Sequence, residues 1–368
     1  MQQVQRNSLT KQEAVCCDAR SRWLSDNCNL QEVEDSYRGI WEANDVKDLS
    51  NDTIITAGER LAMLYIQSGR IKQADAVLKA LGYKCRLAHS ILDYPTSSPL
   101  ESPQNPPCQI YDEYLDSLTL KILRDAFMDP GADYWVHHNY SVEPPSPYYS
   151  FIVPLDNAID ETTCLGNLLR SLQSTSARLK SSIQQATAVE LWAHNRPHAS
   201  GHQFHFDTDN EGCGGVVKHP IITCILYLDA PCGGPSVVTQ QRVSSRALAE
   251  TAWLCPAKSN QLLVMDGKVL HGVVPGKGTA AGRRVTLMLA FWKDIRVREG
   301  GTGAARPFPL EVSWAKTLLQ KVPASDPTKE LRATAPIVLK GVYESVDDGC
   351  PWSRTMGLPE YDEIWQGF

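Results

Sequence analysis

The spacing of three side chains, His205, Asp207 and His271, constrains the possible folds of this chain more than any other sequence feature. His205 and Asp207 stand two residues apart in the stretch GHQFHFDTD, and His271 lies far downstream. Residues i and i+2 of a β-strand point to the same side, so His205 and Asp207 can reach one point while Phe206 faces a packed layer. Short strand-like runs with glycine and proline turns between them recur over residues 188–292. This pattern predicts a β-sandwich or barrel.

Two imidazoles and one carboxylate form a ligand set that suits non-haem Fe(II). Such a set occupies one face of an octahedron and leaves three positions open. Asp209 is an alternative carboxylate of the same parity, but it lies about 13 Å along a strand from His205. His202 is an alternative imidazole of the opposite parity. We therefore predict that His205, Asp207 and His271 bind the metal.

The apolar run RVTLMLAFW, which begins at Arg284, completes an ordered pattern of H-x-D, H and R-x-T. In this order and in these strand contexts, the residues resemble those of the Fe(II)/2-oxoglutarate-dependent oxygenases, in particular the prolyl-4-hydroxylase-like branch. The strand at 223–228, followed by Gly233-Gly234, matches that branch as well. The similarity covers residues 110–295, about half of the chain. It implies a mostly β core with helices, folded as a double-stranded β-helix of the jelly-roll or cupin-like type.

The resemblance also implies how 2-oxoglutarate is held. Arg284 would bind its C5 carboxylate with two charge-assisted hydrogen bonds, and Thr286 on the same face would support it. Arg283 is the alternative if the strand register differs by one residue. Tyr227 matches a tyrosine that reaches the same carboxylate in oxygen-sensing prolyl hydroxylases, with a core tyrosine as the alternative. His194 stands where those enzymes carry another tyrosine, which leaves its role open.

The function implied by the resemblance is oxidation of an unactivated C–H bond with Fe(II), 2-oxoglutarate and O₂, possible stimulation by ascorbate, and release of succinate and CO₂. We expect a small, amino-acid-derived substrate that is hydroxylated, desaturated or cyclised. Natural-product enzymes of the algal kainoid synthase type are candidate relatives. One alternative is a prolyl or other protein hydroxylase. The other is a non-catalytic cupin-like binding protein, which would lack a metal ligand or the arginine for 2-oxoglutarate, and this sequence has all of them. Trp192 either lines the substrate mouth or packs in the core.

The amino-acid composition indicates which classes of partner and which cellular compartment to expect. The hydrophobic fraction of 42% allows a sizeable core, and the net charge of −6 argues against a nucleic-acid partner. No apolar run approaches the roughly 18 residues of a membrane span. The eleven cysteines include no C-x-x-C pair, which indicates reduced thiols. With no apolar signal segment at the N-terminus, we expect a cytoplasmic protein, or an organellar one if a transit peptide was removed. The oligomeric state is not indicated.

Three regions are predicted. Residues 1–100 form a helical extension, and residues 56–83 within it resemble one tetratricopeptide-type hairpin that breaks at Ser68-Gly69. We expect this hairpin to pack on the catalytic domain, with a partner-binding module as the alternative. Five prolines at 94–107 mark a linker. The catalytic domain spans 108–300, and a C-terminal extension over 301–368 packs on the core through Trp352 and Trp365.

Within the catalytic domain, helical spacing predicts two helices before the core strands, and the resemblance implies that such helices cover the outside of the larger sheet. These are the helices at 111–127 and 165–183, with a surface loop at 144–149. The glycines at 212–215 and 233–234 are interpreted as turns, because no helix with Lys-Ser/Thr follows them. Strands are predicted at 150–155, 189–194, the ligand motif, 221–228, 237–239, 261–266 and 284–292.

Overall fold

A computed structural model describes residues 10–43, 52–97, 106–138, 149–155, 160–209, 216–245, 247–297, 305–323, 331–346 and 364–367. The turn predicted at 212–215, most of the loop predicted at 144–149, and Trp352 lie outside these ranges. The nine cysteines whose state is described are all free thiols. Within the described ranges, no helix has the length and apolar content that crossing a membrane requires.

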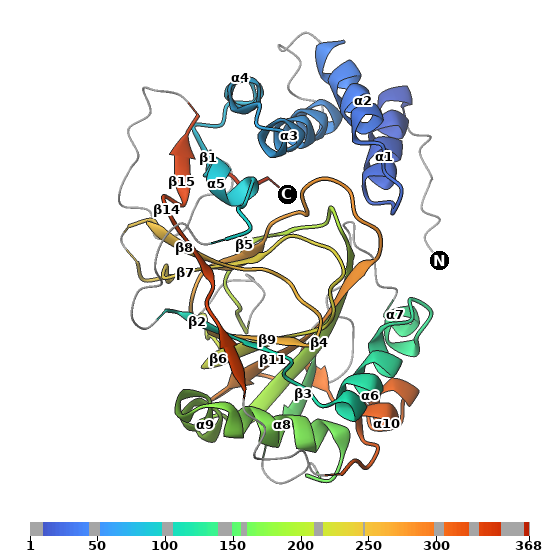
Figure 1. Ribbon diagram of the computed structural model, residues 1–368, viewed down its shortest axis with the longest axis vertical. Helices are drawn as coiled ribbons and strands as arrows, with labels where there is room; N and C mark the ends of the chain where they lie inside the picture. Colours follow the sequence, from blue (N-terminus) through green and yellow to red (C-terminus); the bar gives the residue numbers. More distant parts are fainter. Residues whose placement is uncertain are drawn as a thin grey trace.

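The larger sheet has eight strands in the order β12-β3-β4-β11-β6-β9-β2-β13 (Figure 1). Alternation along β11 sends Val285 and Leu287 to the outer face, while Arg284 and Thr286 face inward. The strands are β2 (Cys108–Asp112), β3 (Phe151–Pro154), β4 (Ala188–Pro197), β6 (Ile222–Asp229), β9 (Gln261–Asp266), β11 (Arg283–Trp292), β12 (Arg306–Pro307) and β13 (Arg332–Thr334).

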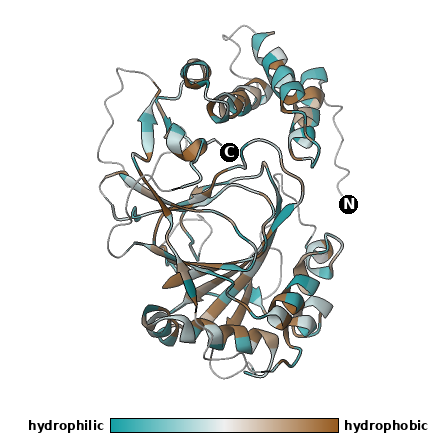
Figure 2. Ribbon diagram, viewed as in Figure 1, coloured by the Kyte–Doolittle hydropathy of each residue, from teal (hydrophilic) through white to brown (hydrophobic). Residues whose placement is uncertain are grey.

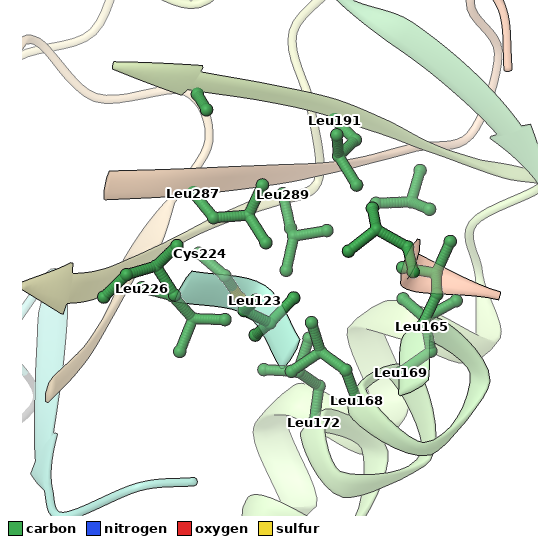
Figure 3. Packing of buried hydrophobic residues seen from close by; sticks show 14 of the residues in the cluster. Leu123, Leu165, Leu168, Leu169, Leu172, Leu191, Cys224, Leu226, Leu287 and Leu289 are labelled. Atoms are coloured by element: carbon green, nitrogen blue, oxygen red, sulfur yellow. The ribbon is translucent and has the colours of Figure 1, made fainter. Parts of the chain in front are cut away.

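Helices cover the outer face of this sheet, as the sequence predicted. Figure 3 shows Leu123 and Leu168 from two of these helices packed near Leu287 and Leu289 of β11. Figure 2 shows that the strands of the larger sheet are rich in hydrophobic residues. The helices in this region are α6 (Ser117–Phe127), α7 (Asp133–His137), α8 (Cys164–Thr175), α9 (Ala177–Gln184) and α10 (Ser313–Leu318).

Two of the predicted helices have different bounds. The helix predicted at 111–127 begins only at Ser117, because 108–112 is strand β2, paired with β9. The side chain of Asp116 caps α6 by accepting hydrogen bonds from two backbone N–H groups. The helix predicted at 165–183 is two helices, since Ser176 has extended backbone and its hydroxyl accepts from the amide of Leu179 to start α9.

A smaller sheet of five strands faces the inner side of the larger one, in the order β14-β8-β7-β10-β5. The sequence did not predict β8, β10 or β14. This pair of sheets is compatible with the expected jelly-roll core. Its strands are β5 (His202–His205), β7 (Ser236–Thr239), β8 (Thr251–Cys255), β10 (His271–Val273) and β14 (Ile337–Lys340).

The outer side of the smaller sheet is covered by the N-terminal helices (Figure 1). Leu61 and Leu78 share one hydrophobic cluster with Phe204, Val237 and Leu254 of the smaller sheet. The predicted hairpin is present as α3 and α4, joined by a turn at Ser68-Gly69. The four helices are α1 (Lys11–Trp23), α2 (Leu30–Glu42), α3 (Asp52–Gln67) and α4 (Ile71–Ala80).

A third, three-stranded sheet joins the segment that follows the N-terminal helices to the C-terminal region. Its order is β15-β1-β16, and Trp365 on β16 is buried, as predicted. The buried guanidinium of Arg86 on β1 forms ion pairs with Asp75 of α4 and Glu344 of β15. These elements are β1 (Cys85–Leu87), the short helix α5 (His89–Leu92), β15 (Tyr343–Ser345) and β16 (Ile364–Trp365).

Candidate metal centre

His205, Asp207 and His271 lie together, at the end of the smaller sheet's strands. One ligand atom from each lies within 4.8 Å of the others, and the described part of the chain holds no second cluster of this kind. Pairing of β5 with β10 sets His205 opposite His271. Asp207 Oδ1 is 3.8 Å from His205 Nε2 and 3.7 Å from His271 Nε2. Strand β5 ends at His205, so Asp207 reaches the cluster from the following loop and not from the strand itself.

Hydrogen bonds turn the three donor atoms toward one another. Each histidine directs Nδ1 at the carbonyl oxygen two residues before it, at 2.7 Å for His205 and 3.0 Å for His271. A carbonyl can only accept, so Nδ1 carries the proton and Nε2 keeps its lone pair. The buried hydroxyl of Thr223 donates to Asp207 Oδ2 at 2.8 Å, which leaves Oδ1 facing the imidazoles. This donor set fits a divalent transition metal with open coordination positions.

The surroundings of His205 keep its imidazole neutral. Burial and, to a smaller extent, the neighbouring His271 lower the pKa of His205 to about 4. Burial also holds the pKa values of His194 and His202 well below their ordinary value. A neutral imidazole has a lone pair available for a cation, so His205 is ready to bind metal at pH 7.

A pocket lies between the two sheets beside the cluster. Its walls combine apolar side chains of both sheets with a few polar groups, as is usual for small-molecule sites. The polar and aromatic side chains of the larger sheet that line it are Trp192, His194, Arg196, Tyr227, Arg284 and Thr286.

The two adjacent arginines of β11 have different surroundings. Arg284 is buried and lines the pocket, where its Nη1 donates to the carbonyl of Gly234 at 2.9 Å. Thr286 is the next residue on the same face and also lines the pocket. Arg283 does not line it, and its Nη2 donates to the carbonyl of Asn195 at 2.8 Å. Of these two arginines, Arg284 is therefore the one placed to meet a ligand in the pocket.

The remaining residues singled out from the sequence also line the pocket. The hydroxyl of Tyr227 lies 2.6 Å from Ser236 Oγ, and burial raises its pKa to about 12, so it stays protonated. His194 is the cross-strand neighbour of Thr286, and Trp192 follows on the same face of β4. The alternative carboxylate, Asp209, is occupied elsewhere, because its Oδ1 accepts from the amide of Lys218 at 2.9 Å.

Sequence reasoning gave no role to Arg196 and Ser236, and it treated His202 only as an alternative ligand. The imidazole of His202 lies outside the metal cluster but stacks on that of His205, with ring centroids 4.3 Å apart. The signal for Arg196 was available, since it continues the alternation of Trp192 and His194 along one strand.

No protein-family model matches the sequence, and no curated protein matches it. Among solved structures, a prolyl-4-hydroxylase from Pseudomonas putida is similar at 15% identity and a TM-score of 0.32, over 53% of this chain and 94% of that one. A viral collagen prolyl hydroxylase from Paramecium Bursaria Chlorella virus-1, in complex with 2OG, is similar at 14% identity and a TM-score of 0.32, over 50% of this chain and 95% of that one. HygX from Streptomyces hygroscopicus, with nickel and 2-oxoglutarate bound, is similar at 13% identity and a TM-score of 0.30, over 50% of this chain and 81% of that one. Similarities at TM-scores this low do not define the function of this chain.

Proposed function

We propose that this protein is an Fe(II)- and 2-oxoglutarate-dependent dioxygenase that oxidises an unactivated C–H bond of a small, amino-acid-derived molecule. The observation that carries the proposal is the convergence on one pocket of a His-Asp-His cluster and the buried guanidinium of Arg284. The cluster provides three ligands on one side of a metal, and the arginine provides a partner for a carboxylate.

Each of these side chains has a defined task in such a reaction. His205, Asp207 and His271 would hold Fe(II), which supplies oxidative chemistry when bound. Arg284 binds the C5 carboxylate of 2-oxoglutarate, and the hydroxyl of Thr286 on the same face supports it. The hydroxyl of Tyr227, kept protonated by its raised pKa, is a second donor toward this end of the pocket.

The shape of the pocket supports a small substrate. Trp192, Ile225 and Met288 of the larger sheet face Val238 and Val273 of the smaller one around the pocket. Walls from both sheets limit the access of water, which strengthens charged contacts inside. A pocket walled by both sheets suits a small molecule better than an extended polypeptide.

The first test compares Asp207→Asn with the matched variant Asp209→Asn, together with His205→Ala. We expect Asp207→Asn and His205→Ala to abolish 2-oxoglutarate consumption without unfolding the protein, because the metal ligands lie at the edge of the packed core. Asp209→Asn should retain consumption, since the carboxylate of Asp209 accepts from the backbone amide of Lys218 and lies outside the metal cluster. Succinate formation and circular dichroism are the measurements. Consumption at the wild-type level in both ligand variants would refute the assignment.

A further inference from the structure

Two arginines lie side by side on one wall of the pocket. Pairing of β4 with β11 sets Arg196 directly opposite Arg284, and both side chains line the cavity. Like charges at directly opposed positions destabilise a pair of strands. Such an arrangement is favourable when anions lie in the pocket beside the strands, because each guanidinium then has a partner.

The surroundings of Arg196 leave part of its guanidinium without a partner. Its Nη1 donates to Ser200 Oγ at 3.3 Å and to the carbonyl of Gly201 at 3.0 Å. Its Nε is buried and has no acceptor, and across the described ranges no carboxylate forms an ion pair with it. A buried charged N–H without an acceptor costs free energy unless a ligand completes it.

The two arginines are directed toward different ends of the pocket. Arg284 is bonded to Gly234, beside the Tyr227–Ser236 contact. Arg196 is bonded to the turn that leads into β5, the strand that carries His202 and His205. The pocket therefore offers one anion position near Gly234 and a second near the metal cluster.

The balance of charge in the pocket also favours a second bound anion. Of the residues that the structure describes, two arginines and no Asp or Glu line the pocket, and the cluster beside it adds the single carboxylate of Asp207. With a divalent ion bound by neutral imidazoles, the two arginines, Asp207 and the ion sum to three positive charges. The 2-oxoglutarate dianion compensates two of these charges. One positive charge remains, and a buried charge needs a partner.

We propose that Arg196 binds a carboxylate of the primary substrate, so that the pocket accepts two different carboxylic acids. This inference rests on the proposed function and specifies its substrate class. A carboxylate is favoured over a phosphate because its single charge matches the one that remains, and because its planar shape suits the guanidinium fork. The substrate carboxylate then lies on the β4 side of the metal ligands.

The experiment uses the full-length protein loaded with Mn(II) and 2-oxoglutarate. A panel of amino acids and N-alkyl amino acids, each also supplied as its methyl ester, is tested for binding by thermal shift and calorimetry. The variants are Arg196→Gln, Arg196→Lys, Arg284→Gln and, as the control outside the pocket, Arg283→Gln. We expect the acids to bind roughly tenfold or more tightly than their esters. Arg196→Gln should remove this preference, and Arg196→Lys should restore part of it.

The outcomes separate this inference from the proposed function. If Arg196→Gln weakens 2-oxoglutarate binding as much as Arg284→Gln does, Arg196 belongs to the co-substrate site and the inference is wrong. It is also overturned if the panel contains no acid whose affinity depends on both its free carboxylate and Arg196. In either case the proposed function stands, provided that 2-oxoglutarate binds and requires Arg284. If 2-oxoglutarate does not bind the Mn(II)-loaded wild type, the proposed function itself fails.

Discussion

At the scale of single residues, neighbouring side chains of one type differ because β-strand alternation separates them. Arg284 faces the pocket and Arg283 faces Asn195, although both are arginines on β11. The order of ligands and arginine along the chain was enough to predict this assignment. The alternation along one strand could place Arg196 on the same face as Trp192 and His194, but its position opposite Arg284 could not be predicted, because strand register is not visible in the sequence alone.

Arg284→Ala should therefore raise the 2-oxoglutarate requirement steeply, while Arg283→Ala should change it little. The first substitution leaves the C5 carboxylate buried without its partner, a loss of about 2–5 kcal/mol. Titration of the anaerobic Fe(II) enzyme with 2-oxoglutarate, followed by the charge-transfer absorption, measures the difference. The opposite result for the two arginines would mean that the register of β11 is shifted by one residue.

His198 gives the pocket rim a dependence on pH. Its Nδ1 accepts from the amide of Gly233 at 3.0 Å, and its Nε2 lies 3.1 Å from the carbonyl of Lys277. Burial lowers the pKa of His198, and the charge of Arg284 lowers it further. A protonated ring would lose the bond from Gly233, which packs against Arg284.

The unfolded chain takes up a proton at His198 near pH 6.5, before the folded protein does, so the free energy of unfolding falls as the pH drops below that value. The loss is complete once the pH is below the lowered pKa of the folded state. The free energy of unfolding, measured with urea, should differ between pH 7.5 and pH 5.5 by less in His198→Gln than in the wild type. His194, His202 and His205 contribute with the same sign, so the comparison is between wild type and variant. An unchanged difference would show that His198 does not contribute.

At the scale of elements, the error over 111–127 shows where periodicity fails. Tyr111, Leu115, Leu118 and Ile122 have helical spacing, yet Leu118 is 43% exposed and Tyr111 belongs to a strand. Strand β2 is buried on both faces, because Tyr111 belongs to the hydrophobic cluster under the helices and Ile110 to the cluster between the two sheets. A short apolar run of this kind can be interpreted as a strand or as a helix. The true start of α6 was marked by Asp116, which caps it.

Asp116→Ala should destabilise the protein by about 0.5–2 kcal/mol, the usual contribution of a helix N-cap. The side chain accepts from the amides of Leu118 and Thr119, and both donors would lose their acceptor. Urea unfolding is the measurement, and Asp125→Ala is the matched control, because Asp125 is exposed on the same helix and forms only a surface pair with Lys121. Equal stabilities of the two variants would contradict the cap.

At the scale of the whole molecule, the N-terminal helices and the smaller sheet form one hydrophobic cluster. Polar contacts extend this attachment to the loop before β11. Gln67 donates to the carbonyl of Pro275 at 3.2 Å, and Lys277 pairs with Asp93 at 2.7 Å. Because Lys277 also contacts His198, the helical region is linked to the rim of the pocket. Sequence alone predicted the hairpin but not this link, since it depends on contacts about two hundred residues apart.

We therefore expect residues 1–100 to act as a structural brace and not as an independent binding module. Their deletion would expose Val237 and Leu254, and each buried aliphatic side chain contributes about 1.5–3 kcal/mol. The remaining fragment should aggregate or unfold at a much lower temperature than the full chain. Leu78→Ala in the full chain is the milder test and should cost about 2–5 kcal/mol, while the exposed Leu118→Ala should cost little. If a fragment that begins near Cys108 is soluble, monomeric and fully active on a small substrate, the brace is wrong. The hairpin would then be a docking module, and a protein substrate would become the better proposal.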